Sequence, residues 1–150
     1  MNSALDAAPV MAALCTAPDS SREALLRLAA DRIRAAGEPY TSVYLYMLHG
    51  DELILEAWSG RDTEHTRIPV GKGVCGSAVA TGEDQNVGDV RSRGNYIACN
   101  LFTRSELVVL IRKQGEIIGQ IDVDSDQVDP FTAAEVAAVR QVADLLGELL

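Results

Sequence analysis

The spacing of apolar residues predicts helices at both ends of the chain. A short helix fits residues 1–16 provided that it begins near Pro9, because proline is tolerated in a first helical turn. A second helix follows the capping box Ser20–Glu23, and Gly37 with Pro39 ends it. A third opens at the capping box Thr132–Glu135. Its apolar stripe consists of Val136, Val139, Val142, Leu146 and Leu149.

Between these helices the pattern changes to the alternation that is typical of strands. Two hairpins are predicted, with strands at residues 41–48, 52–58, 106–112 and 116–124. An edge strand is predicted at residues 85–90 and a short helix, with glycines at both ends, at residues 73–82. The segments 59–72 and 91–103 are predicted to be irregular.

Strands joined as hairpins, with helices at both chain ends, predict the α+β class and a central antiparallel sheet. The terminal helices are expected to cover one face of that sheet. The long middle loops and a ligand pocket are expected on the other face. The 150 residues suit one domain, with a helical segment at residues 1–36 and a core at residues 40–150.

Composition restricts the possible functions more than it restricts the possible folds. The net charge of −9 argues against nucleic acid as a partner, because phosphate binding needs a basic stripe. No apolar run reaches the ~20 residues of a membrane span. Asp6 stands where a secretion signal carries Lys or Arg, so a cytoplasmic protein is expected. The apolar residues of the terminal helices, Leu5, Val10 and Leu14 among them, predict a homodimer.

The strand at residues 116–124 places two carboxylates on one face. Alternation puts Asp122 and Asp124 together with Gln120, opposite Ile117, Ile121 and Val123. The face is either simply solvated or part of a site. A calcium loop is a further interpretation, since Asp126 continues the acidic series. It fails because Gln127 replaces the required glycine and Ala133 replaces the bidentate glutamate.

The three cysteines are interpreted as thiols, because nothing indicates export. Cys15 lies in an apolar stretch and is interpreted as a small hydrophobic residue of the core or of an interface. Cys75 lies near a predicted helix start, where the helix dipole lowers a thiol pKa, although tight packing explains a small residue equally well. Cys99 follows a glycine-containing turn. No cysteine or histidine spacing indicates a metal site.

Four motifs in order resemble the free methionine-(R)-sulfoxide reductases, which are single-domain GAF proteins. The motifs are Gly71–Ala80, Ile97–Cys99, Ser105–Val109 and Gly119–Ser125, and the likeness runs from about residue 40 to the C-terminus. The resemblance implies a GAF-like fold over residues 1–150. It also implies that Cys99 attacks the sulfoxide and that Cys75 resolves the product. His65 stands where the family usually carries a third cysteine.

The resemblance further implies the substrate contacts and the partners. Glu106, Asp122 and Asp124 align with carboxylates that hold the substrate. Attack by Cys99 yields methionine and a sulfenic acid, which Cys75 converts to a Cys75–Cys99 disulfide. No bound cofactor is expected, and thioredoxin is expected to supply the reducing equivalents.

Two other classes of function stay open at this point. One is a GAF module that binds a small molecule as a sensor without catalysis, which the absent third cysteine favours. The other is a purely structural dimerisation unit, which uses the terminal helices but leaves Cys75 and Cys99 unexplained.

Overall fold

The computed structural model describes residues 3–92 and 102–150. Six strands form one antiparallel sheet in the order β3-β2-β1-β6-β5-β4. The strands are β1 (Ser42–His49), β2 (Glu52–Ser59), β3 (Arg67–Pro69), β4 (Gln85–Val87), β5 (Ser105–Lys113) and β6 (Glu116–Ser125). The helices are α1 (Ala7–Cys15), α2 (Arg22–Arg34), α3 (Gly73–Thr81) and α4 (Ala133–Leu149). The predicted class, α+β with terminal helices on one face, is confirmed.

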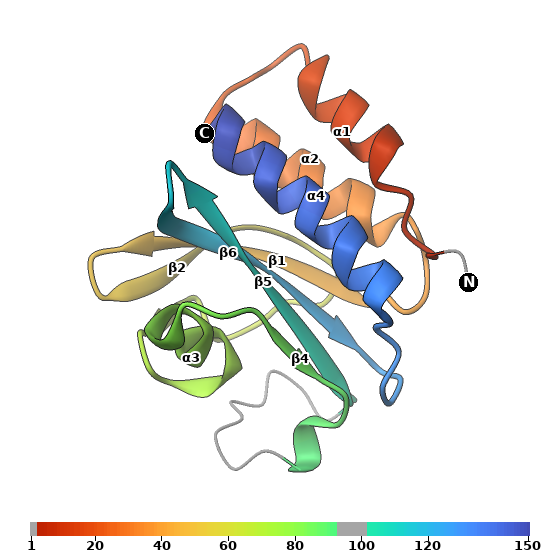
Figure 1. The fold of residues 1–150 in the computed structure, drawn as a ribbon, viewed down its shortest axis with the longest axis vertical. Coiled ribbons are helices and arrows are strands. Elements are labelled where there is room, and N and C mark those ends of the chain that lie inside the picture. The colour runs from red at the N-terminus through yellow and green to blue at the C-terminus, as the bar shows by residue number, and fades with distance from the viewer. Residues whose placement is uncertain (1–2, 93–101) are drawn as a thin grey trace.

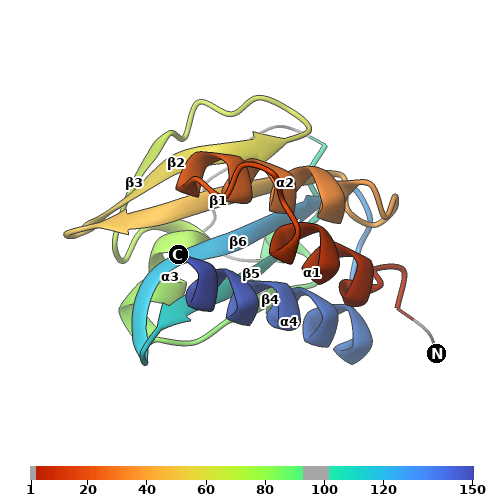
Figure 2. The same cartoon turned by 90° about the horizontal axis from the view of Figure 1, so that it is seen from above.

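Helices α2 and α4 pack side by side on the sheet, and α1 packs on these two helices (Figures 1 and 2). The core between the sheet and these helices contains the apolar face of β1, which is Val43, Leu45 and Met47. Helix α3 lies on the opposite face of the sheet (Figure 1). A second, smaller core there contains Tyr44 and Tyr46 of β1. The two faces of β1 therefore contribute side chains to two different cores.

Capping explains where the helices begin. Thr132 accepts a hydrogen bond from the backbone N–H of Glu135, as the capping box predicts. The predicted box Ser20–Glu23 is displaced by one residue, because Ser21 is the residue that caps α2. Glu135 does not complete its own box. Its carboxylate instead accepts from Ser3, from the N–H groups of Ala4 and Leu5, and from the hydroxyl of Tyr40.

Three expectations about the elements were wrong. Strand β3 lies inside the segment predicted to be irregular, and the predicted edge strand shortens to β4, after which Val90–Ser92 forms a 3₁₀ turn. Ile117 was expected on the same face as Ile121, but it packs against the smaller core that contains Tyr44 and Tyr46. The cause is a register shift, because Ile111 pairs with Gly119 but Arg112 pairs with Ile117.

The apolar stripes of the terminal helices pack within the same chain. The core between the sheet and the helices buries five of these residues, which are Leu5, Val10, Leu14, Val139 and Leu146. Cys15, by contrast, is exposed and belongs to no core. Within residues 3–92 and 102–150, no helix has the length and apolar character needed to span a bilayer.

Candidate functional site

Three acidic residues lie buried on the face of the sheet opposite α1, α2 and α4. Asp122 and Asp124 alternate with core residues along β6, and Glu106 of β5 pairs directly with Asp124. Their exposed fractions are 5% for Glu106, 1% for Asp122 and 2% for Asp124. The face is therefore covered, which excludes the solvated interpretation.

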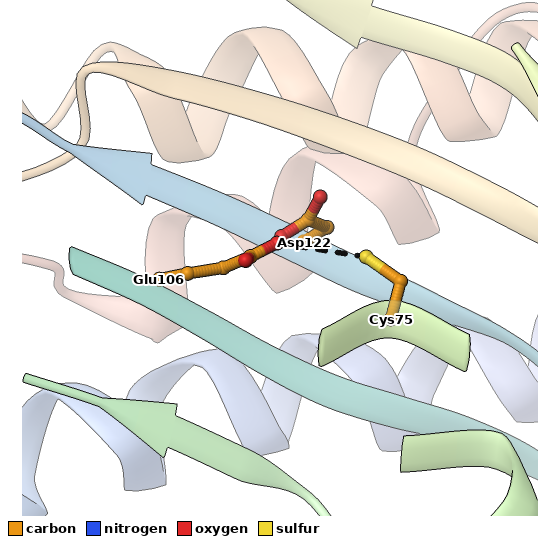
Figure 3. A group of neighbouring side chains, drawn as sticks. All are labelled: Cys75, Glu106 and Asp122. Carbon is orange, nitrogen blue, oxygen red and sulfur yellow. Dashed lines mark hydrogen bonds between the residues drawn. The ribbon is translucent and has the colours of Figure 1, made fainter. Parts of the chain in front are cut away.

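Cys75 reaches this acidic face from α3 (Figure 3). Its thiol donates a hydrogen bond to Oε2 of Glu106 at 3.5 Å, and its carbonyl accepts one from Gln120 at 3.1 Å. Two glycines permit the placement of α3. Gly73 has a φ of +63°, and a Cβ on Gly76 would come within 2.5 Å of the carbonyl oxygen of Pro69. The start of α3 thus fits closely against the turn that precedes it.

Burial and negative charge raise the pKa of Cys75 well above that of a free thiol. Burial is the largest cause, followed by the charges of Asp122 and Glu106. The sequence predicted a lowered pKa from the helix dipole, and that prediction was wrong. A helix terminus contributes about 0.3–1 kcal/mol, which does not offset desolvation beside carboxylates.

Asp122 and Asp124 also hold protons more tightly than in water. Burial, and then the charge of Asp124, raises the pKa of Asp122 to about 7. Burial and the charge of Glu106 raise the pKa of Asp124, while Arg61 opposes the shift. The cluster therefore retains a proton near neutral pH, and it shares that proton as a coupled group.

Part of this cluster has no hydrogen-bond donor. Both carboxylate oxygens of Asp124 and Oδ1 of Asp122 lack partners among the described residues. A buried, unpaired carboxylate is unfavourable by several kcal/mol. The arrangement is suited to a cationic ligand that brings its own donors.

The cavity beside these residues is small. It is lined by Tyr46, His65, Ile68, Lys72, Gly73, Val74, Cys75, Glu106 and Asp122. Its volume is about 10 Å³. That is about the space one water requires.

Two tyrosines of β1 that were not predicted as site residues lie on the same face of the sheet as the acidic cluster. The hydroxyl of Tyr44 donates to the carbonyl of Arg61, and that of Tyr46 donates to the carbonyl of His65, both at 2.7 Å. They fix the segment between β2 and β3 over the sheet. The signal was present in the alternation of β1, because Tyr44 pairs with Asp122 across the strands.

The third aspartate of the acidic series lies outside the cluster. Asp126 is partly exposed and forms a two-pronged ion pair with Arg61, at 2.6 and 2.7 Å. This ion pair lowers the pKa of Asp126. Asp122 and Asp124 lie on a regular strand rather than in a loop. The calcium interpretation therefore has no loop to support it.

Of the two remaining cysteines, the structure describes only Cys15. Cys99 lies outside the described residues. Cys15 is exposed at the end of α1, on the helix side of the sheet, whereas Cys75 is buried on the other side. The sheet therefore separates Cys15 from the site.

Comparison with known proteins gives consistent matches. The GAF domain family matches residues 21–150. The chain is 37% identical over 105 residues to the free methionine-R-sulfoxide reductase of Escherichia coli K12. The match covers 70% of this chain and 63% of that protein, so it spans less than two thirds of this curated relative.

Two solved structures are similar over most of their length. The type II free methionine-R-sulfoxide reductase of Thermoplasma acidophilum has a TM-score of 0.82 at 37% identity, covering 85% of this chain and 90% of the other. The free methionine-R-sulfoxide reductase of Neisseria meningitidis, solved with its substrate, has a TM-score of 0.88 at 30% identity. The match covers 99% of this chain and 93% of the Neisseria chain.

Proposed function

This chain belongs to the free methionine-R-sulfoxide reductases, a family of GAF domain proteins, and on that premise we propose that it reduces free methionine-R-sulfoxide to methionine. The observation that carries the proposal is the buried carboxylate of Asp124, which lacks donors among the described residues and lies beside Asp122 and Glu106. The ammonium group of a free amino acid supplies three donors and a positive charge. It satisfies the oxygens that the described residues leave unpaired.

In the proposed reaction Cys99 is the nucleophile. Its thiolate attacks the sulfoxide sulfur and forms a transient sulfur–sulfur bond. This bond and the sulfur–oxygen bond then break as the oxygen, with one proton, passes to Cys99 as a sulfenic acid. Methionine is released, reduced by two electrons. Cys75 then attacks the sulfenic sulfur, so that a Cys75–Cys99 disulfide forms and water leaves. A thioredoxin dithiol returns two electrons and two protons.

The electrostatics of Cys75 support its place as the second thiol. Its raised pKa keeps the resting thiol protonated, and a protonated thiol is a poor nucleophile. First attack is therefore assigned to Cys99. Asp122, whose pKa is raised to about 7, is suited to protonate the leaving oxygen near neutral pH.

The test compares free methionine-R-sulfoxide with its N-acetylated form, using pure protein and dithiothreitol. We expect methionine from the free amino acid only, because the acetylated form lacks the charge that the carboxylates bind. Equal rates on the two substrates would contradict recognition of the amine. No reaction with either, together with a different small molecule in the pocket, would favour the sensor function.

The disulfide has its own test. Mass spectrometry after substrate treatment without reductant is expected to find a Cys75–Cys99 crosslink. A Cys15→Ser variant is the control and is expected to form the same crosslink, since the sheet separates Cys15 from the site. A crosslink through Cys15 would refute the assignment of Cys75.

Cytoplasmic location and a homodimer complete the proposal. A cytoplasmic setting suits a cycle that depends on reduced thiols. The dimer surface must differ from the stripe that the sequence indicated, because most of that stripe is buried within one chain. Leu149 of α4 stays exposed and is available to an interface. Light scattering is expected to give twice the chain mass of 16.1 kDa, and the single-chain mass would exclude the dimer.

A further inference from the structure

Three groups of the kind that bind metal ions converge in the cavity. They are the Sγ atom of Cys75 from α3, a carboxylate oxygen of Glu106 from β5 and one of Asp122 from β6 (Figure 3). All three ligand atoms lie within 4.8 Å of one another, and all three residues are buried. Two of the three come from paired strands of the sheet, which holds their backbones at a fixed separation.

The separation of the sulfur and the oxygen suits a tetrahedral ion. A zinc ion bonded to sulfur at about 2.3 Å and to oxygen at about 2.0–2.2 Å holds these two atoms about 3.5–3.7 Å apart. Sγ of Cys75 lies 3.5 Å from Oε2 of Glu106. The pair needs little movement to become two ligands of one ion.

The third ligand is available for a bond. Asp122 is 1% exposed, lines the cavity, and has no hydrogen-bond partner at Oδ1 among the described residues. The cavity, at about 10 Å³, has room for a single ion or water. A buried carboxylate oxygen without a donor among the described residues, on a side chain that lines a space of that size, indicates a small cationic ligand.

We propose that the reduced protein binds one Zn²⁺ ion through Cys75, Glu106 and Asp122, with water at the fourth position. The sulfur ligand decides the class of ion. Thiolate favours zinc and similar borderline or soft ions, whereas magnesium and calcium take oxygen ligands. The three ligands carry one negative charge each, which exceeds the charge of the ion. The site is therefore suited to a divalent cation rather than to a monovalent one.

Occupation of this site has a consequence for activity that rests on the proposed function. The ion takes two of the carboxylates that bind the substrate ammonium group, so zinc and substrate compete. A Cys75–Cys99 disulfide removes the sulfur ligand, so only the reduced protein binds the ion. Zinc thereby acts as a reversible inhibitor of the reduced form.

The test measures binding directly and so does not depend on activity. The full chain is reduced with a phosphine, because dithiothreitol itself binds zinc, and is titrated with Zn²⁺ against a chromophoric chelator. We expect one equivalent to bind tightly. Co²⁺ in place of Zn²⁺ is expected to give the intense visible bands of a tetrahedral site and a thiolate-to-cobalt charge-transfer band.

Matched variants identify the ligands. Cys75→Ser and Asp122→Asn are each expected to weaken binding at least about a hundredfold, since even outer-sphere partners of a metal site contribute about 10–100-fold. Cys15→Ser and Asp126→Asn make the same chemical changes outside the site and are expected to bind as the unaltered chain does. Circular dichroism checks that each variant is folded.

Several results would overturn the proposal. These are failure of the unaltered chain to bind one equivalent, a cobalt spectrum without the charge-transfer band, or full retention of binding by folded Cys75→Ser. The cobalt spectrum is recorded on the unaltered chain and so decides the matter even if a variant fails to fold. Zinc binding in a protein without reductase activity would leave this site standing and refute only the proposed function.

Discussion

Asp122 links the stability of the protein to pH. Between about pH 4 and pH 7 the folded protein holds a proton on Asp122 that the unfolded chain has released, since burial raises the pKa from 3.8 to about 7. The free energy of unfolding therefore falls as the pH rises. From pH 5 to pH 8 the loss due to this residue is about 2–3 kcal/mol.

Asp122→Asn is expected to remove that dependence. Asparagine has nearly the same shape and cannot ionise, so the variant gains stability relative to the unaltered chain as the pH rises from 5 to 8. Urea unfolding at the two pH values measures the effect. Asp126→Asn is the control, because the lowered pKa of Asp126 confines its effect to more acidic solution. Parallel pH profiles for the Asp122 variant and the unaltered chain would refute the argument.

Asp124 is expected to matter for substrate rather than for the fold. Asp124→Asn keeps the shape of the side chain but removes the charge that binds the ammonium group. Loss of one partner in a buried charged contact costs about 2–5 kcal/mol, so kcat/KM should fall about thirtyfold or more. The circular dichroism spectrum should not change. A value within threefold of that of the unaltered chain would exclude Asp124 from binding.

At the scale of elements, β1 supports the segment that forms the cavity wall. Tyr46→Phe removes the hydroxyl that donates to the carbonyl of His65. We expect a loss of about 1 kcal/mol in the free energy of unfolding, together with a higher KM, because the wall loses an anchor. Denaturant unfolding and steady-state kinetics measure the two effects.

Tyr40→Phe provides the comparison for this prediction. Tyr40 is equally buried, but its hydroxyl donates to Glu135 on the helix side of the sheet. The variant is expected to lose stability without a change in KM. If both variants raised KM by the same factor, the higher KM of Tyr46→Phe would come from a general loss of stability. It would not come from a change in the cavity wall.

At the scale of the whole molecule, ligand binding should stabilise the fold as well as fill the site. A ligand at a hundred times its Kd adds about 2.7 kcal/mol to the free energy of unfolding. For a domain of this length that raises Tm by about 5–10 °C. Thermal unfolding of a Cys99→Ser variant with free methionine sulfoxide checks this without turnover. The N-acetylated compound is expected to leave Tm unchanged, and an equal rise with both compounds would contradict it.

The sequence alone determined the order of the helices and of the four long strands, and the faces of those strands. Strand residues alternate with a period of two, so Asp122 and Asp124 had to share a face, and Val43, Leu45 and Met47 had to share another. Capping chemistry at Thr132 placed the start of α4. Such features depend on neighbours in the chain, which a sequence displays directly.

Tertiary structure decided what depends on residues far apart in the chain. The register shift near Ile117 moves that residue to the other face, although local alternation predicts the opposite. Cys75 is near a helix start, yet its pKa is raised, because Asp122 and Glu106 approach it from strands more than thirty residues away. Desolvation and charge at close range outweigh the local dipole, and only the folded chain brings those groups together.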